Sequence, residues 1–543
     1  MTRARTRSLS ALLALVVGAF VLVPTTPAMA VDYVSITGAG SSWSSTAIEQ
    51  WTRNVKQYGM KVAYSSTGSS DGRNQFKAGT VDFAVSEIPY GIKDGGVTDQ
   101  APSRGFAYMP IVAGGTAFMY NLSSGGKQIT NLRLSGEVIT KIFTGVITEW
   151  DDAAIKADNP GLALPKRSIV PVVRSDGSGS TAQLSTWMSQ EHKKLWDAYC
   201  VKAGRSAPCG VTSNYPTIPG KGFISQPNSQ GVSGYVAQKA NIGTITYVEY
   251  SYALKTGYPV AKVLNDSNYY VEPTASNVAV GLLGAKINTD LTQVLTGVYN
   301  NKDKRAYPLS SYSYMIIPTR VEGPITEAKG KTLGAFSTYF LCEGQQQAEV
   351  LGYSPLPINL VKAGLKQVNK IPGVDAKTVD IKKCNNPTFS SDGTNTLAKN
   401  APQPPACDQK GAAQCTVGTG GAKAETPTSG TPSKSGTGNT ATATTAPTTG
   451  TGTNGTGTGT GTGTETGTGV VGGTGATTGG GPVSCEADTG VCTNVVALPV
   501  EVSSNTSWTP QQSLMVAAVI LVLGLVIVPP VIGQLIARRR RNG

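Results

Sequence analysis

Short apolar runs typical of β-strands alternate along this chain with segments whose apolar residues recur at helical spacing. The runs at 34–36, 62–64, 81–87 and 169–173 predict strands, and only Pro171 disturbs the last of them. Helical spacing follows the first and the last of these runs, at Ile48, Trp51, Val55 and Tyr58 and then at Leu184, Trp187, Met188 and Leu195. Strands that alternate with helices favour an α/β fold.

Turns rich in glycine and serine join strand to helix at three places, 38–43 (GAGSSW), 67–72 (TGSSDG) and 174–181 (RSDGSGST). A short helix is expected at 73–79, after the second turn. The N-terminus of a helix presents free backbone N–H groups and the positive end of the helix dipole, so each turn can hold an anion. A single turn of this kind can equally serve only to cap the helix that follows it. Three such turns in one chain favour an anion cradled by several helix N-termini.

Three charged side chains belong to the same anion-site hypothesis. Arg174 offers a fork of donors that fits a tetrahedral oxyanion, and Asp176 is close enough in sequence to hold that fork in place. The strand at 81–87 ends on a carboxylate, Glu87. Further along, 314–318 predicts a strand, and Leu333, Phe336 and Phe340 form an apolar helix stripe that we assign to the core.

Both ends of the chain carry signals for export and membrane attachment. Residues 1–30 have the form of a secretory signal peptide, with three arginines, an apolar run and Ala28-Met29-Ala30 before the cleavage point. Residues 514–537 contain no charged residue and would span about 36 Å as a helix, enough to cross a bilayer. We therefore expect one transmembrane helix there, with 538–543 as a basic cytoplasmic tail.

A low-complexity tether is predicted between the folded part and this helix, at 386–513. Glycine and threonine dominate from about 418 to 481, a segment with almost nothing to bury. The eight cysteines all lie in the exported part, which favours disulfides over metal. Proximity suggests the pairs Cys200–Cys209, Cys407–Cys415 and Cys485–Cys492, which leaves Cys342–Cys384, although the sequence does not prove this pairing.

The formal charge of +13 is not evidence for a nucleic-acid partner. Seven positive charges lie in the signal and the basic tail, which leaves +6 for the rest of the chain. His192 is the only histidine, and it lies in a polar stretch that we place on a solvated helix face. A Ser-His-Asp system would have to use it. No zinc-ligand set or phosphate loop of a nucleotide-binding enzyme is visible, so no metal, cofactor or enzyme activity is expected.

The chain resembles the phosphate-binding proteins of Pst-type ABC importers. The matching pieces follow the family's order between about 32 and 373: Gly38–Trp43, Gly68-Ser69-Ser70, Val81-Asp82-Phe83, Trp150-Asp151-Asp152, Asn159-Pro160-Gly161-Leu162, Arg174–Ser180 and Tyr247-Val248-Glu249-Tyr250. The resemblance implies a two-lobed periplasmic-binding-protein fold of type II over 32–385. Lobe one would comprise about 32–115 and 255–385, and lobe two about 116–254, with phosphate enclosed between them.

The resemblance also implies a ligand shell. Its members in this chain would be Ser42, Trp43, Ser69, Glu87, Arg174, Ser178, Gly179 and Ser180, with Asp176 orienting Arg174. The family usually has Asp at the position of Glu87, Phe at Trp43 and Thr at Ser180. Glu87 matters most, because the family's carboxylate accepts the proton that phosphate carries and sulfate lacks. Glu87 either points into the cleft or turns away toward solvent or a lysine.

Three functions from different classes remain open. The first is an extracytoplasmic phosphate-binding protein, tethered to the membrane, that delivers inorganic phosphate to the permease of an ABC importer. The second keeps the fold but is a surface sensor or structural protein that binds another oxyanion or nothing. The third is a phosphatase-like hydrolase that uses Ser178 or Ser42.

Overall fold

The structure is a computed structural model that describes residues 33–94, 96–375, 381, 384–390 and 393–428, and the backbone of 484–485 and 492–493. The described residues up to 428 belong to one compact unit, and the backbone at 484–485 and 492–493 belongs to a second. The predicted signal peptide, most of the tether and the predicted transmembrane helix at 514–537 lie outside the described residues. Among the helices in the described part of the chain, none is long and apolar enough to cross a membrane.

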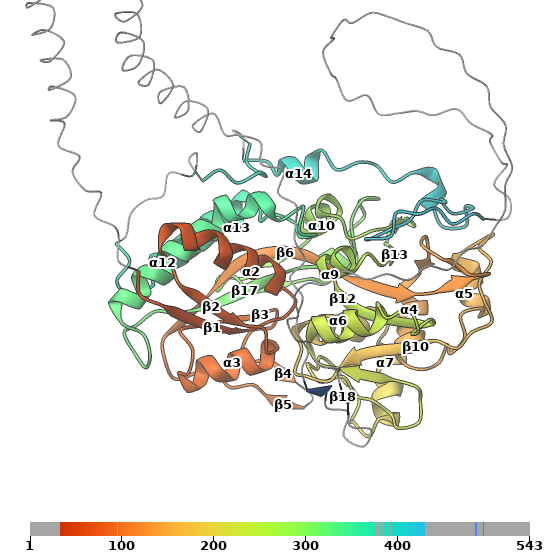
Figure 1. The fold of residues 1–543 in the computed structure, drawn as a ribbon, viewed down its shortest axis with the longest axis horizontal. Helices are drawn as coiled ribbons and strands as arrows, with labels where there is room; N and C mark the ends of the chain where they lie inside the picture. The colour runs from red at the N-terminus through yellow and green to blue at the C-terminus, as the bar shows by residue number, and fades with distance from the viewer. Residues whose placement is uncertain are drawn as a thin grey trace, which may run out of the picture. The chain divides into compact units, whose positions relative to one another are not determined.

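The first lobe is built on parallel strands in the order β2-β1-β3, which are Val62–Ser65, Ile36–Gly40 and Phe83–Ser86. Helix α2 (Ser45–Asn54) and helix α3 (Ser69–Ala78) connect them and lie on opposite sides of this part of the sheet (Figure 1). Helix α3 begins earlier than the helix predicted at 73–79. The chain turns at Gly68, whose φ of 98° suits glycine, so Ser69 and Ser70 are already helical.

The second lobe repeats this arrangement. Strand β10 (Val170–Arg174) lies between β11 (Ile224–Gln226) and β12 (Thr244–Glu249), and both pairings are parallel. Helix α6 (Gly179–Glu191) follows β10, and helix α8 (Asn228–Val236) follows β11. Because the carboxyl ends of parallel strands share one edge of a sheet, the N-termini of α6 and α8 start close together.

Two long antiparallel strands join the halves of the sheet. The first part of β6 (Phe106–Asn121) pairs with β17 (Ser310–Pro318), and its second part pairs with β12. Strand β17 also pairs with β3, so the sheet order is β11-β10-β12-β6-β17-β3-β1-β2. The periplasmic-binding-protein-like α/β fold expected from the resemblance is confirmed, and β17 contains the strand predicted at 314–318.

Two large hydrophobic cores correspond to the two lobes. Helices α12 (Glu327–Leu341) and α13 (Ile358–Val368) belong to the first, and Leu333, Phe336 and Phe340 are fully buried there, as the stripe predicted. The predicted return to this lobe at residue 255 stays a prediction, because the segment after it contributes to both cores. Strand β13 (Val260–Leu264) pairs with β6, and its Val263 belongs to the second core together with Leu309, whereas Val278 belongs to the first.

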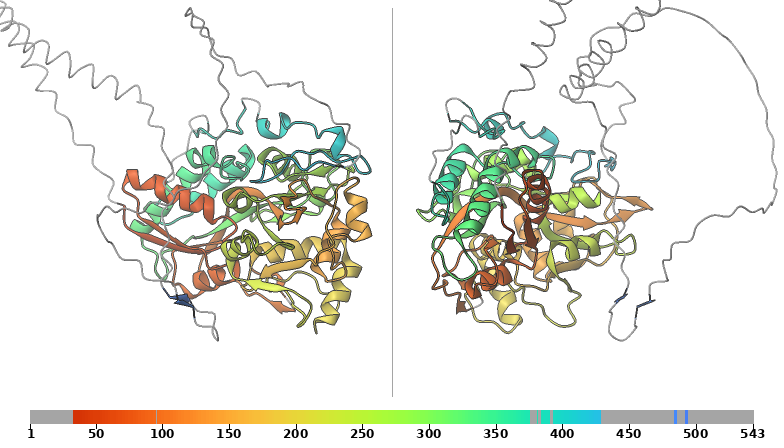
Figure 2. Two further views of the ribbon diagram at one scale, coloured as in Figure 1. Left: turned by 45° about the vertical axis from the view of Figure 1, so that its right-hand side comes forward. Right: turned by 60° about the vertical axis from the view of Figure 1, so that its left-hand side comes forward.

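The beginning of the tether predicted at 386–513 packs against the lobes. Residues 393–428 lie along one edge of the body in both views of Figure 2. Thr419 is fully buried, and its hydroxyl donates to the carbonyl of Thr130 at 3.0 Å, while Asp408 forms an ion pair with Lys262 at 2.5 Å. The local composition of this segment does not predict these polar contacts, because their partners lie far away in the sequence.

Three of the four suggested disulfides are present: Cys200–Cys209, Cys342–Cys384 and Cys407–Cys415. The backbone of β18 (Ser484–Cys485) pairs with that of β19 (Cys492–Thr493), and the register sets Cys485 opposite Cys492. The third disulfide closes a short loop within the segment at 393–428. A covalent link of this kind limits the freedom of the unfolded loop.

Candidate functional site

Glu87 leaves the end of β3 and is almost fully buried, with 1% of its surface exposed. Its Oε1 accepts hydrogen bonds from the hydroxyls of Ser41 and Ser313, the latter at 2.5 Å. Its Oε2 accepts from the hydroxyl of Ser69 at 2.7 Å. The alternative in which Glu87 turns to solvent or a lysine is therefore wrong, and the carboxylate lies inside a ring of serine donors.

The N-terminus of α6 faces this carboxylate. The backbone N–H of Gly179 donates to the hydroxyl of Ser69 at 3.2 Å, across the two lobes. A Cβ on Gly179 would lie 1.9 Å from Oε2 of Glu87, so any larger residue here would displace the carboxylate from this position. Ser178 caps the helix through its hydroxyl, which accepts from the N–H of Thr181 at 3.2 Å. The buried hydroxyl of Ser180 has no partner within the described residues.

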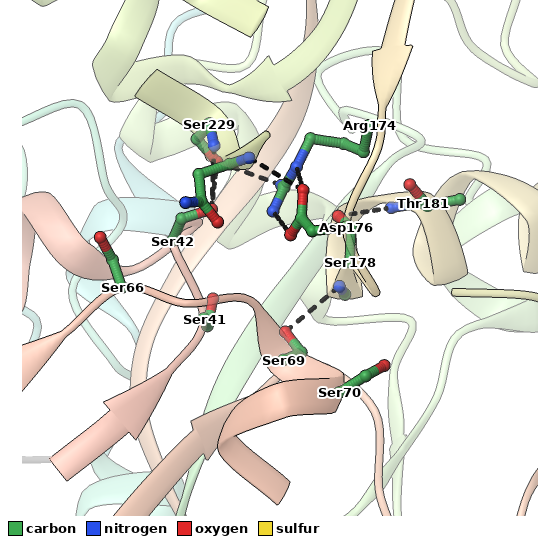
Figure 3. A network of polar contacts seen from close by, with 12 residues as sticks. Ser41, Ser42, Ser66, Ser69, Ser70, Arg174, Asp176, Ser178, Thr181 and Ser229 are labelled. Atoms are coloured by element: carbon green, nitrogen blue, oxygen red, sulfur yellow. Dashed lines mark hydrogen bonds and ion pairs between the residues drawn. The ribbon is translucent and has the colours of Figure 1, made fainter. Parts of the chain in front are cut away.

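Arg174 and Asp176 form the bidentate pair that the sequence predicted. Nε of Arg174 donates to Oδ1 of Asp176 at 2.7 Å, and Nη2 donates to Oδ2 (Figure 3). The remaining Nη1 points to the hydroxyl of Ser229 at 3.4 Å. The Arg174 side chain is almost fully buried, whereas Asp176 is partly exposed. Asp176 also accepts from the backbone N–H of Asn228 at 2.8 Å, which ties the pair to α8.

Ser42 and Trp43 lie in the loop before α2, on the other side of the same centre. The hydroxyl of Ser42 lies 2.9 Å from the hydroxyl of Ser229 and accepts from the Ser229 N–H at 3.0 Å. The backbone N–H of Trp43 donates to the hydroxyl of Ser41 at 3.0 Å. The loop, α3, α6 and α8 therefore converge on one buried polar centre, and Figure 3 shows their side chains together.

All predicted site residues are thus brought into one region, but three further serines belong to it. Ser41 lies inside the predicted GAGSSW turn, directly before the predicted site residues Ser42 and Trp43. Ser229 is at the start of α8, and a fourth Gly/Ser-containing helix start, after β11, could have indicated it. Ser313 is on the buried strand β17, where no local pattern marks a hydroxyl as functional.

The side chains of this centre do not add up to an excess of positive charge. Arg174 is already paired with Asp176, and Glu87 adds a second carboxylate. An anion placed here would therefore be held mainly by neutral donors, namely serine hydroxyls and backbone N–H groups. A buried carboxylate repels a fully ionised anion but accepts a hydrogen bond from one that carries a proton.

His192 lies far from these serines. Ser178 immediately precedes the 13-residue helix α6 and His192 immediately follows it, so about 20 Å of helix separates them. The imidazole is partly buried against Trp187, with ring centroids 4.9 Å apart, rather than solvated as expected. Burial lowers the pKa of His192. This histidine therefore cannot activate Ser178, as a hydrolase would require.

Comparisons with known proteins identify the family of this chain. The family model of the PBP superfamily domain matches residues 24–343. The phosphate-binding protein PstS of Xylella fastidiosa is 34% identical over 332 residues, covering 61% of this chain and 83% of that protein. PstS of Methanocaldococcus jannaschii is 30% identical over 356 residues, covering 62% and 86%. A solved phosphate-bound periplasmic phosphate-binding protein, PfluDING, is 18% identical with a TM-score of 0.46, covering 63% of this chain and 100% of its own.

The family model spans more than half of the chain, and the PstS relatives are matched over most of their own length. The resemblance that the seven sequence pieces suggested is therefore confirmed. This chain belongs to the PstS phosphate-binding proteins, within the periplasmic-binding-protein superfamily.

Proposed function

We propose that this protein is an extracytoplasmic solute-binding protein that captures inorganic phosphate between its two lobes and delivers it to the permease of an ABC importer. The observation that carries the proposal is the position of Glu87, a buried carboxylate set among serine hydroxyls opposite the N-terminus of α6. The relatives in Xylella fastidiosa and Methanocaldococcus jannaschii are named phosphate-binding proteins, which supports the same ligand.

The proposed phosphate shell combines one charged fork with many neutral donors. Its members are Ser42, Trp43, Ser69, Glu87, Arg174, Ser178, Gly179 and Ser180, with Asp176 orienting Arg174. Phosphate at neutral pH carries at least one proton, which the Glu87 carboxylate would accept, whereas sulfate carries none. The unpartnered hydroxyl of Ser180 offers one further donor to the anion.

Isothermal titration calorimetry with phosphate and with sulfate tests this proposal. We expect the wild type to bind phosphate and to show no heat with millimolar sulfate, because a site built around a required hydrogen bond rejects the analogue that lacks it by about 10⁴–10⁵. Equal binding of both anions, or of neither, would contradict the assignment. Loss of high-affinity phosphate uptake on deletion of the protein, restored by the wild type but not by Arg174→Ala, would extend it to transport.

We further propose that residues 514–537 span the membrane and that 429–513 tether the lobes to its outer face. The uncharged apolar stretch, followed by four arginines, supports this placement. Attachment at the outer face would keep the binding lobes close to the permease.

A further inference from the structure

The loop that precedes α2 presents three consecutive backbone carbonyls to three tyrosine hydroxyls. Each carbonyl accepts a tyrosine hydrogen bond from a different part of the fold, and the Ser42 carbonyl also accepts from the Ser45 N–H at 3.4 Å. The pairs are Tyr64 with the Ser41 carbonyl at 2.8 Å, Tyr252 with the Ser42 carbonyl at 2.5 Å, and Tyr353 with the Trp43 carbonyl at 2.6 Å.

The three tyrosines are fixed in place by their surroundings. Tyr64 is on β2 and stacks on Phe83, with ring centroids 6.3 Å apart. Tyr252 is on α9 (Tyr250–Thr256), and Tyr353 follows the 3₁₀ helix η2 (Glu343–Gln347); both are nearly or fully buried. Burial raises the pKa of all three phenols, so they remain protonated donors at physiological pH.

These bonds determine where the loop's N–H groups point. In a trans peptide the C=O and N–H groups point in opposite directions. A carbonyl that accepts a tyrosine hydrogen bond on one side of the loop therefore turns the N–H of the next residue to the other side. The N–H groups of Trp43 and Ser44 converge on the hydroxyl oxygen of Ser41, at 3.0 and 3.4 Å. That hydroxyl donates to Glu87. A hydrogen bond to the carbonyl also polarises the peptide and strengthens its N–H as a donor.

We propose that Tyr64, Tyr252 and Tyr353 are positioning residues of the anion site, which hold the carbonyls of residues 41–43 so that the N–H groups of Trp43 and Ser44 stay on the side of the loop where the Ser41 hydroxyl and Glu87 lie. The proposal rests on the proposed function, because it assumes that phosphate binds at this loop. Tyr252 has an added role, since α9 follows β12 of the second lobe while Ser42 belongs to the first. Its bond therefore links the two lobes directly behind the ligand.

Phosphate calorimetry on the full chain with Tyr64→Phe, Tyr252→Phe and Tyr353→Phe is the first test. Phenylalanine keeps the ring and removes only the hydroxyl. We expect each variant to bind phosphate about three- to tenfold more weakly, the effect of losing one intramolecular hydrogen bond. The matched control is Tyr307→Phe, which removes an equally buried hydroxyl that donates to the carbonyl of Thr116 at 2.6 Å, outside the loop. Its affinity should equal that of the wild type.

A spectroscopic readout distinguishes positioning from general stability. Trp–Ser occurs in this chain only at Trp43–Ser44, so ¹³C-carbonyl tryptophan with ¹⁵N serine gives a single carbonyl–amide correlation in the NMR spectrum. Tyr353→Phe should shift this signal and Tyr307→Phe should leave it in place, with thermal unfolding measured for both.

Wild-type protein that binds no phosphate would contradict the proposed function. Normal wild-type binding with unchanged affinity in all three tyrosine variants would overturn only the positioning proposal. An equal loss of affinity in Tyr307→Phe, or an unshifted Trp43–Ser44 signal in Tyr353→Phe, would overturn it too.

Discussion

Glu87 illustrates how a single side chain controls the chemistry of this site. The family usually has the shorter aspartate here, so the longer glutamate side chain of this protein requires a cavity of a different shape. The structure supplies hydroxyls from Ser41, Ser69 and Ser313 around the carboxylate, and a glycine at 179 that leaves room for Oε2. At the scale of single residues, the Glu87 carboxylate is therefore held by donors from several parts of the chain.

Substitution of Glu87 should change which anion binds. Glu87→Gln replaces an acceptor by an amide that can also donate, so phosphate affinity should fall while sulfate binding appears or rises. Glu87→Asp should keep the preference for phosphate, with an affinity set by how far the shorter arm reaches. Competition calorimetry with both anions measures this; unchanged affinities in Glu87→Gln would place the residue outside the shell.

Arg174 should contribute most of the charge-based affinity. Removing one partner of a buried, hydrogen-bonded charge pair costs roughly 2–5 kcal/mol, so Arg174→Ala should weaken phosphate binding by at least about thirtyfold. Asp176→Ala should cost less, because Asp176 orients the guanidinium rather than the anion. Titration calorimetry checks both, and wild-type affinity in Arg174→Ala would remove this residue from the site. Lys156→Ala, at an exposed ion pair, is a suitable control.

At the scale of elements, the site is a meeting of helix N-termini. Helices α3, α6 and α8 and the loop before α2 each contribute a serine hydroxyl or a backbone N–H to the same centre. Their partial positive charges favour an anion without adding a formal charge. This suits a site that already holds two carboxylates beside one guanidinium.

The start of α6 gives a direct test of this packing. Gly179→Ala would place a Cβ 1.9 Å from Oε2 of Glu87 and 2.5 Å from the Ser69 hydroxyl, so phosphate binding should be lost or severely weakened. Gly234→Ala in α8 is the control, because nothing lies within 4 Å of its added Cβ. That variant should bind normally and be more stable by up to about 1 kcal/mol, since alanine favours a helix interior. Calorimetry and urea unfolding compare the two.

At the scale of the whole molecule, polar contacts hold the two lobes together around the site. One such contact involves the hairpin of β4 (Lys93–Asp94) and β5 (Val97–Thr98). Asp94 accepts hydrogen bonds from the Ser213 N–H at 2.8 Å and from the Ser213 hydroxyl. The Ser213 carbonyl in turn accepts from the N–H of Ser178, at the start of α6. The hairpin of one lobe is thus connected to the anion-facing helix of the other.

Asp94→Ala should therefore speed phosphate release. We expect a several-fold higher dissociation rate with little change in thermal stability, because the lost contact joins the lobes rather than stabilising either core. Stopped-flow fluorescence measures the rate. Lys93→Ala, on the same hairpin but exposed, should behave as the wild type, and identical rates in both variants would show that the contact does not restrain opening.

The membrane attachment is a second whole-molecule prediction. The full chain should fractionate with membranes and remain accessible to external protease, whereas truncation after Ser507 should release it into the medium. Cell fractionation and immunoblotting check this. Retention of the truncated protein at the membrane would reveal another attachment.

The sequence by itself determined the family, the alternation of strands and helices, and most of the residues that meet in the buried polar centre. Those signals are local: a run of β-branched residues, a Gly/Ser turn before a helix, or an arginine two residues from an aspartate. Arg174 with Asp176, and Glu87 at the end of β3, could be found this way because each motif lies within a few residues of chain.

Only the tertiary structure decided which distant groups complete the site and where the lobes begin and end. Ser313 reaches Glu87 from 226 positions away, and Tyr353 reaches the Trp43 carbonyl from 310 positions away. The segment after 255 contributes Val263 and Leu309 to the second core and Val278 to the first, and residues 393–428 pack against the body through polar groups such as the Thr419 hydroxyl. Such contacts arise from chain topology, and no local pattern of hydrophobic and polar residues encodes them.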